Sequence, residues 1–405
     1  MYTKTSEVVS QGHPDKCADV IADSIVDIAI IGDENSRVAS EVFVAGKNII
    51  IGGEIKSNAN LNDAIYHQIV VDALTKIGYG TQKYFSYDEA LHTDDIKVQV
   101  LLNQQSPEIS QGVDQSSGEI GAGDQGIMFG YANEETSNYM PSAITYARAI
   151  MERVYQYALD NPDKLGVDIK TQVTVDYGTQ KNFENCLPQK IHTIVVSAPS
   201  VASMHIDEVR LLIQSLIDSS GLNKALYDPD DCIIYINPTG KYTNHSSLHD
   251  AGLTGRKLIV DSFGGYAPIG GGAQSSKDYT KVDRSGLYVA RYLAKHIVAS
   301  KLAKKATVEL SYAIGVAKPL SISVNTERTM LVEGIDDVLL AKFLEDNFPL
   351  TPQWITNKFG LDKPSKDTFL YANVAGRGQV GQEDYPWEQL DDLEKFTELK
   401  GTQNV

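Results

Sequence analysis

This 405-residue chain has few cysteines, a deficit of basic residues and no long apolar run. Its three cysteines, Cys17, Cys186 and Cys232, show no spacing typical of a metal site, so we expect reduced thiols in a cytoplasmic protein. No apolar run approaches the ~18 residues that a membrane span requires, and the N-terminus has no signal-peptide core. The sequence therefore predicts no membrane partner.

Lysine and arginine number 36 against 53 aspartates and glutamates, which gives a formal net charge of −17. Such a balance argues against binding nucleic acid or an anionic membrane through the overall field. We therefore expect any anionic ligand to be held by a local basic site.

The hydrophobic periodicity predicts one order of elements three times: a helix, a β-hairpin, a second helix and a strand. The first set is expected at 14–31, 37–45 with 48–55, 61–77 and 96–102. The second is expected at 141–159, 170–177 with 190–198, 206–217 and 232–238. The third is expected at 284–302, 307–315 with 320–325, 335–348 and, more weakly, 368–374.

Hairpins between helices indicate the α+β class, with helices on one face of each sheet. Several strands are apolar at both alternating positions, as in "NIIIGG" and "CIIYI". Such sheets need cover on both faces, so we expect them to pack on each other or on a partner subunit.

Glycine and positive charge are concentrated in residues 252–285, "GLTGRKLIVDSFGGYAPIGGGAQSSKDYTKVDRS". Glycines let backbone N–H groups approach an anion, and a helix that begins here adds a favourable dipole. Lysine and arginine neutralise phosphate charge. This segment is typical of a polyphosphate site, although a flexible loop with solvated lysines has the same composition.

Four acidic residues are candidate cation ligands. Asp15, in "GHPDK", and Asp283, in "KVDRS", fit Mg²⁺, which takes one or two carboxylates and completes its shell with phosphate and water. Ordinary first-turn or capping charge explains both equally simply. Glu41 and Glu54 lie on apolar strands, where a carboxylate either faces solvent or needs a cation or hydrogen-bond partner.

The motifs "GHPDK", "GAGDQG", "NPTG", "GLTGRK", "KVDRS" and "SYAIGVA" occur in this order, and in them the chain resembles the S-adenosylmethionine synthetase family. The resemblance implies three similar domains with pseudo-threefold symmetry, each a mixed sheet covered by helices on one face. The continuous ranges 2–102, 116–238 and 239–390 approximate these domains, although each domain is expected to include segments from other parts of the sequence. It also implies a homodimer with sites between subunits, which in this family is often paired into a tetramer.

The implied reaction joins ATP to L-methionine: the sulfur attacks ribose C5′ and displaces tripolyphosphate, which is then hydrolysed to pyrophosphate and phosphate. The implied cofactors are Mg²⁺, two per site, held by Asp15 and Asp283, and K⁺ at Glu41. The alternative is a catalytically degenerate, nucleotide-binding relative with a regulatory role.

The resemblance also assigns the remaining site residues. The catalytic set is His13, Lys170, Arg256, Lys277 and Asp283. The wider ATP site adds Asp124, Asp168, Lys241, Tyr242 (as the ring stacked on adenine), Asp250, Lys257 and Ala273. The methionine site comprises Glu54, Gln105, Asp250, Lys281 and Ile314. Residues 104–126, polar and rich in Gly and Ser, match a mobile lid.

This chain departs from the family pattern after "NPTG", where it reads "KYTNHSSLHDAG" and the family usually has Arg-Phe followed by a small, glycine-containing stretch. We expect residues 244–249 to border the adenosine and methionine sites. The glycine-rich motif also differs, since 274–276 read "QSS".

Overall fold

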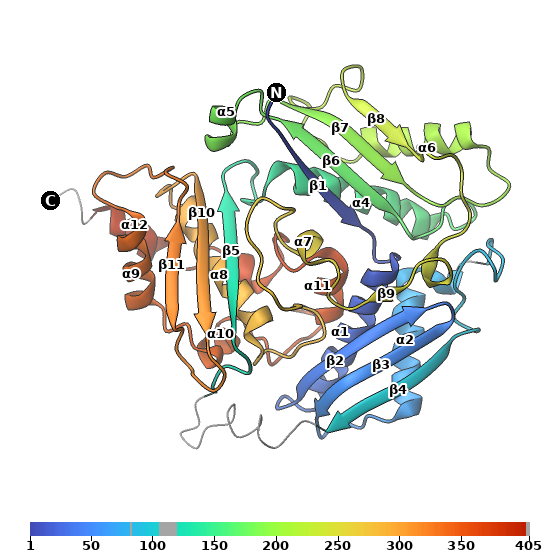
Figure 1. Cartoon of the computed structure of the whole chain (residues 1–405), viewed down its shortest axis with the longest axis horizontal. Helices are drawn as coiled ribbons and strands as arrows, with labels where there is room; N and C mark the ends of the chain where they lie inside the picture. Colours follow the sequence, from blue (N-terminus) through green and yellow to red (C-terminus); the bar gives the residue numbers. More distant parts are fainter. Residues whose placement is uncertain (82, 105–119, 402–405) are drawn as a thin grey trace.

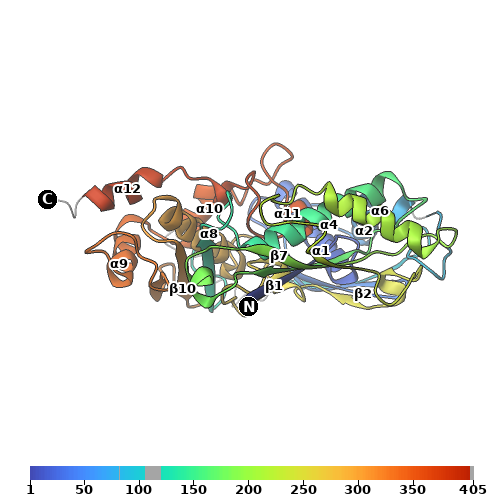
Figure 2. The ribbon, with the colours of Figure 1, turned by 90° about the horizontal axis from the view of Figure 1, so that it is seen from above.

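The structure is a computed structural model that describes residues 1–81, 83–104 and 120–401. Three β-sheets are arranged around a common centre (Figure 1), with strand orders β4-β3-β2-β9, β1-β6-β7-β8 and β11-β10-β5. Most of the helices lie on one side of these sheets, as Figure 2 shows. The α+β class and the three helix-covered sheets are therefore confirmed.

Two of the three predicted sets of elements form as expected. The first comprises α1 (Pro14–Gly32), β2 (Arg37–Ala45), β3 (Asn48–Lys56), α2 (Asp63–Ile77) and β4 (Lys97–Gln104). The second comprises α4 (Ser142–Asp160), β6 (Lys170–Asp176), β7 (Lys190–Ser197), α6 (Ile206–Asp218) and β8 (Ile233–Ile236). In both sets the last strand runs parallel to the second strand of the hairpin.

The third set departs from the prediction at its end. It comprises α8 (Val282–Ala299), β10 (Lys305–Tyr312), β11 (Ser321–Asn325) and α9 (Asp337–Asn347). The prediction of a strand at 368–374 was wrong, because α11 (Tyr371–Arg377) lies there. The buried carboxylate of Asp27 on α1 accepts the backbone N–H groups of Tyr371 and Ala372, at 2.8 and 2.9 Å, and so caps this helix.

Three strands that the periodicity did not predict join each sheet to a distant part of the chain. Strand β1 (Thr3–Val9) pairs with β6, β5 (Gly126–Asn133) with β10, and β9 (Gly252–Leu253) with β2. Each sheet thus takes an edge strand from another region of the sequence, which makes the three units interleave.

Helix α8 packs closely on β5 because Gly130 has no side chain. A Cβ there would lie 1.9 Å from the carbonyl carbon of Ala290, so no other residue fits. At the other end of the chain the Trp387 ring stacks on Tyr288 with ring centroids 3.7 Å apart, and both side chains are fully buried. These contacts place the core between the sheets and the helices.

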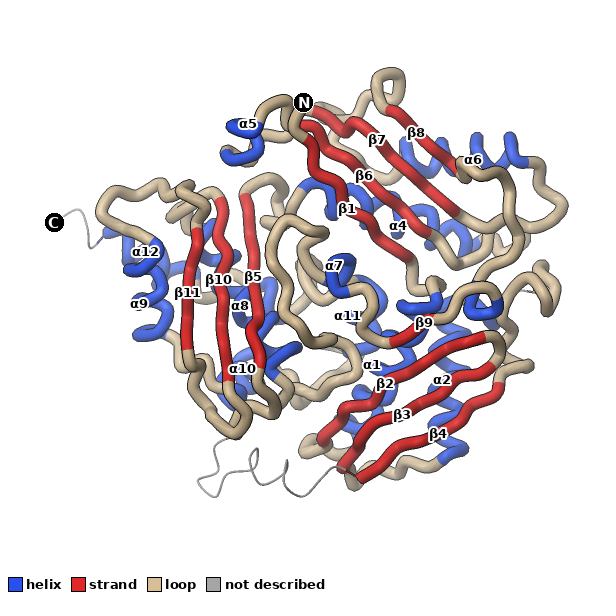
Figure 3. The backbone as a smooth tube through the Cα atoms, viewed as in Figure 1, coloured by secondary structure: helices blue, strands red, loops and turns tan. Residues whose placement is uncertain are grey.

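The remaining helices are short and fill the spaces beside the sheets (Figure 3). They are α5 (Gln180–Glu184), α7 (Leu258–Asp261), α10 (Pro352–Phe359) and α12 (Leu393–Gly401). None of the helices described is long and apolar enough to cross a membrane.

The faces of the sheets opposite the helices carry large apolar side chains in contact with solvent. Phe43 and Leu101 are exposed on the first sheet, Ile233 and Tyr235 on the second, and Ile127 on the third. Apolar groups gathered on an uncovered face are typical of a surface that another chain covers.

Candidate active site

The first cluster of predicted residues surrounds the start of α1. His13 is the N-cap of this helix, and its ring Nδ1 accepts the N–H of Asp15 at 3.1 Å. Burial, together with the charges of Lys170 and Lys257, lowers the pKa of His13 to about 3. The imidazole is therefore neutral near pH 7, and because Nδ1 is an acceptor, its hydrogen lies on Nε2.

Asp15 connects α1 to the loop that carries two of the predicted cations. Its carboxylate lies 2.5 Å from Lys257 Nζ and 3.5 Å from Arg256 Nη1, and it accepts the N–H of Leu253 at 3.0 Å. Burial opposes the ionisation of Asp15, but the Lys257 and Leu253 hydrogen bonds outweigh it and lower its pKa. The carboxylate is thus charged and available to a cation.

Asp168 provides an acceptor that the protein itself does not fill. Its Oδ2 accepts the N–H of Ser246 at 3.2 Å, whereas Oδ1 is buried without a hydrogen-bond partner in the part of the chain that the structure describes. Burial raises the pKa of Asp168 to about 6, against the charge of Lys170, and Asp250 raises it further. An unsatisfied buried oxygen beside a cluster of cations suits a ligand hydroxyl.

The second cluster surrounds the start of α8. Asp283 lies 2.5 Å from Lys277 Nζ, and the glycine-rich segment passes directly over it. A Cβ on Gly272 would lie 2.2 Å from Asp283 Cγ, so a side chain there would displace this carboxylate. Lys281 bonds the buried Asp278 at 2.6 Å, and Asp278 in turn accepts the N–H of Val38 on β2.

Two further predicted residues, Ile314 and Asp124, lie in loops near this second cluster. Ile314, half-exposed, is in the loop after β10. In that loop the N–H of Gly315 donates to Ala122, and Gly123 donates to Thr280, next to α8. Asp124 follows directly and is exposed.

Ala273 lies where the two basic loops touch. Gly255, with φ +78°, approaches it so closely that a Cβ would lie 2.5 Å from the Ala273 side chain. Glu41 and Glu54 lie on the uncovered face of the first sheet, where Glu54 pairs in register with Ala39, and Ala39 in turn forms a β-bridge with Lys277 of the second cluster. Gln105 and most of the predicted lid, residues 105–119, lie outside the described residues.

Tyr242 and Lys241, both predicted to contact ATP, have different surroundings. Tyr242 lies near Asp168, and burial raises the pKa of its hydroxyl. The amine of Lys241 points to backbone carbonyls instead and donates to Ala202 and Met204, at 2.5 and 2.8 Å.

Residues 244–249 do more than border a site. His245, Ser246 and Ser247 are buried, and they bond to other loops: Ser246 Oγ accepts the N–H of Leu91, and Ser247 Oγ donates to Gly46. The N–H of Ser246 donates to Asp168 and so reaches the first cluster. The polar stretch is therefore mainly a scaffold that holds neighbouring loops.

The structure also shows positioning residues that the sequence analysis missed. Lys16 is buried between Asp19 and Asp261, at 3.1 and 2.5 Å, and Asp19 accepts the N–H of Gly255 at 2.9 Å. This network fixes the 252–261 segment to α1. A signal was present, because aspartates recur at every fourth residue of this helix, on one of its faces (Asp15, Asp19, Asp23, Asp27).

The predicted residues thus form two clusters, each with its own aspartate and lysine. Asp15 is paired with Lys257 and Arg256, whereas Asp283 is paired with Lys277. Among the described residues no group of three or more His, Cys, Asp or Glu side chains is placed to hold a metal ion.

Comparisons with known proteins identify the family of the chain. Three family models match: the N-terminal domain of S-adenosylmethionine synthetase over residues 1–107, its central domain over 119–242 and its C-terminal domain over 245–389. The chain belongs to the S-adenosylmethionine synthetase family.

Relatives of this family resemble the chain over nearly its whole length. The S-adenosylmethionine synthase of Zymomonas mobilis is 41% identical, with 98% of each chain covered. That of Mesoplasma florum is 40% identical, with 96% of this chain and 97% of the relative covered. A solved structure, described as an unusual S-adenosylmethionine synthetase from Campylobacter jejuni, is 64% identical with a TM-score of 0.94, covering 98% of this chain and all of that one.

Proposed function

We propose that this chain synthesises S-adenosylmethionine from ATP and L-methionine. The methionine sulfur attacks C5′ of the ribose, the C5′–O bond breaks, and tripolyphosphate leaves and is then hydrolysed to pyrophosphate and phosphate. The observation that carries this proposal is the neutral His13 beside Asp15, Lys170 and Lys257, in a chain of this family.

The first cluster suits the departure of a polyphosphate. Negative charge grows on the oxygen that leaves C5′, and groups fixed in advance around that oxygen lower the barrier. His13 Nε2–H is a neutral donor for this oxygen, and Lys170, Arg256 and Lys257 supply positive charge. Because Asp15 and Asp19 hold the 252–257 loop through backbone N–H groups, these cations need little reorganisation.

The unpaired Oδ1 of Asp168 would accept a ribose hydroxyl, and Tyr242 would stack on the adenine ring. We assign the methionine to the region of Glu54, Gln105, Asp250, Lys281 and Ile314. Asp124 and Ala273 would border the nucleotide, whereas the bonds of Lys241 to backbone carbonyls favour a supporting role for that residue.

Asp15 and Asp283 have the chemistry that Mg²⁺ requires, since each offers carboxylate oxygens beside a lysine that a polyphosphate would draw away. When bound, Mg²⁺ would neutralise charge on the phosphate oxygens. Glu41 offers one carboxylate on an uncovered sheet face, which fits K⁺ only if further oxygens come from a neighbouring surface.

A homodimer with shared sites explains why the predicted residues fall into two clusters. If the Asp283 cluster of one subunit faces the Asp15 cluster of the other, the two aspartates and all the cations surround one polyphosphate. The exposed apolar side chains of the uncovered sheet faces would be buried in the same contact.

Co-expression of two inactive variants, Lys257→Ala and Lys277→Ala, tests this assembly. Half of the dimers are mixed and one of their two sites is intact, so the mixture should recover about a quarter of the wild-type rate. Sites contained within one subunit would give no recovery.

The activity is tested by incubating the purified chain with ATP, Mg²⁺, K⁺ and methionine. We expect the sulfonium product together with phosphate and pyrophosphate. ATP binding without product would instead indicate the degenerate regulatory relative, and phosphate without sulfonium would indicate a tripolyphosphate hydrolase.

A further inference from the structure

The third sheet lacks a strand that the other two sheets have. In the first unit the strand after the second helix, β4, pairs with β3, and in the second unit β8 pairs with β7. The strand that corresponds to β3 and β7 in the third unit is β11. Among the described residues β11 has β10 as its only strand neighbour. The chain after α9 continues into α10 instead.

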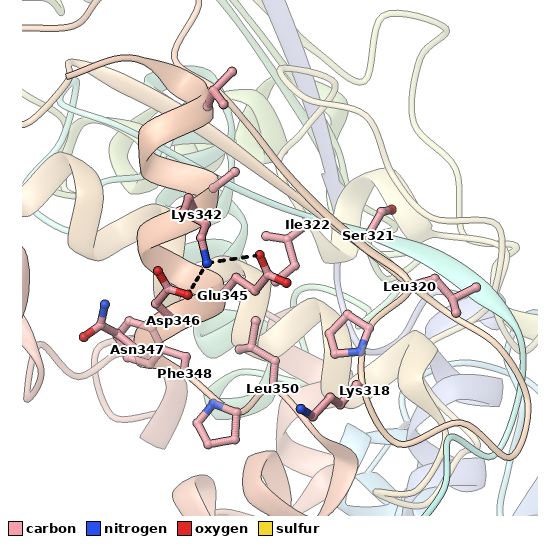
Figure 4. Close-up of a pocket in the computed structure, with 14 residues that line it drawn as sticks. Lys318, Leu320, Ser321, Ile322, Lys342, Glu345, Asp346, Asn347, Phe348 and Leu350 are labelled. Carbon is pink, nitrogen blue, oxygen red and sulfur yellow. Dashed lines mark hydrogen bonds and ion pairs between the residues drawn. The ribbon is translucent and has the colours of Figure 1, made fainter. Parts of the chain in front are cut away.

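The absence of this strand changes how the covering helix packs. Helices α2 and α6 lie against β4 and β8, whereas α9 lies against β11 itself. A groove of about 760 Å³ runs between residues 318–322 and α9. Figure 4 shows its two walls, with Leu320 and Ile322 on the strand side and Lys342 and Glu345 on the helix side.

Exposed aliphatic side chains line the groove beside polar and charged ones. Leu320 is 63% exposed and Val338, in the first turn of α9, is 76% exposed, while Phe348 and Leu350 form a buried floor. The charges of the lining balance, because Lys318 and Lys342 offset Glu345 and Asp346, and Lys342 pairs with both acids on its own helix. Exposed aliphatic side chains at the open edge of a sheet are costly unless something covers them.

We propose that this groove is a docking site for an extended apolar segment of another protein, which adds a strand to the open edge of the third sheet. The strands β4 and β8 indicate the chemistry of this segment. Their inward-facing residues are aliphatic at alternate positions: Val98, Val100 and Leu102 in β4, and Ile234 and Ile236 in β8. A segment of this pattern would pack its apolar face on α9 and bond its backbone to β11.

The probe is a displayed library of eight-residue peptides, selected on the full-length chain. We expect enriched sequences with aliphatic residues at alternate positions, and slowed amide exchange in residues 320–325 when such a peptide is added. Both substituted side chains are exposed, so the variant should keep the wild-type melting temperature and synthetase rate.

Affinity of a labelled enriched peptide, measured by fluorescence anisotropy, decides the proposal. We expect it to be about tenfold weaker on Leu320→Lys/Val338→Lys, because two apolar contacts are lost. It should be unchanged on the matched control Leu211→Lys, which alters a 74% exposed leucine on α6. The single variant Val338→Thr, which adds no charge, should weaken binding by a smaller factor.

Three outcomes would overturn the proposal. One is that no peptide is enriched, and another is that enriched peptides bind the groove variant as tightly as the wild type. The third is a smaller oligomer for Leu320→Lys/Val338→Lys than for the wild type in light scattering, because the groove would then hold a second copy of this chain.

Discussion

The starts of α1 and α8 carry the same pattern of side chains and use it differently. In both helices the second residue is an aspartate paired with a lysine from a loop, Asp15 with Lys257 and Asp283 with Lys277. The third residue is a buried cation, Lys16 or Arg284. The start of α1, however, adds a neutral histidine, whereas the start of α8 adds a glycine-rich segment.

The equivalent helix of the second unit shows what these side chains contribute. Helix α4 begins with Ser142 and Ala143 and has no acidic residue in its first turn. All three helix N-termini offer the same favourable dipole to an anion. The residues in the first turn and the adjoining loops, rather than the repeated fold, therefore decide which units carry chemistry.

The first turns of α1 and α8 are both held in place by aspartates on one face of α1. Lys16 pairs with Asp19, Arg284 pairs with Asp23, and Asp23 accepts the N–H of Ser276 in the glycine-rich segment at 2.8 Å. The aspartates of α1 thus hold both basic loops, which makes this helix the common support of the two clusters.

The largest expected effect comes from removing either buried cation. Arg284→Met and Lys16→Met should each lower the free energy of unfolding by about 3–5 kcal/mol, because a carboxylate is left buried without its partner. Urea titration measures this. Arg210→Met, which removes an exposed pair with Asp207, is the control and should cost under about 1 kcal/mol. A small effect for only one of the two would show that α1 supports only one cluster.

The two loop lysines should be equivalent for catalysis. Lys257→Ala and Lys277→Ala should each reduce kcat/KM for ATP by about 10²–10³, because each removes a charge contact to the leaving polyphosphate. Both side chains are partly exposed, so the fold should survive. Lys241→Ala is the matched control, with a much smaller expected change. Near-normal turnover of either loop variant would remove its cluster from the ATP site.

The neutral His13 at the start of α1 should make the free energy of unfolding depend on pH. Its pKa is lowered from 6.5 to about 3, so the unfolded chain binds an extra proton between these values and stability falls as pH falls below about 6.5. Between pH 8 and pH 5 this amounts to about 2 kcal/mol. His13→Asn should therefore show a smaller loss of unfolding free energy over that range. An identical pH dependence in the variant and the wild type would contradict a neutral, buried His13.

The smallest effect is expected at Tyr242, next to the first cluster only. Tyr242→Phe keeps the ring and should change KM for ATP by less than about threefold, while Tyr242→Ala should raise it by about tenfold through lost stacking. Steady-state kinetics measures both. Equal effects of the two substitutions would show that the hydroxyl, not the ring, is what matters.

Much of the architecture could be predicted because its signals are local. Helix α2 begins where the Asn62 side chain accepts the N–H of Ile65, and it ends at Gly78, which has φ +112°. The strands β1, β5 and β9 were not predicted, since each is stabilised by a partner strand far along the chain. The helix at 371–377 was not predicted for the same reason, because it is capped by Asp27, over 300 residues earlier.

The amino-acid sequence by itself determined the repeated order of elements, the motifs of the family and the residue types near each helix start, because these depend on neighbours a few positions apart. Only the tertiary structure decided that Asp15 and Asp283 belong to separate clusters and that α1 supports both. It also decided that His13 is neutral and that β11 has an open edge. These properties depend on burial and on charges brought together across the chain, which no local pattern specifies.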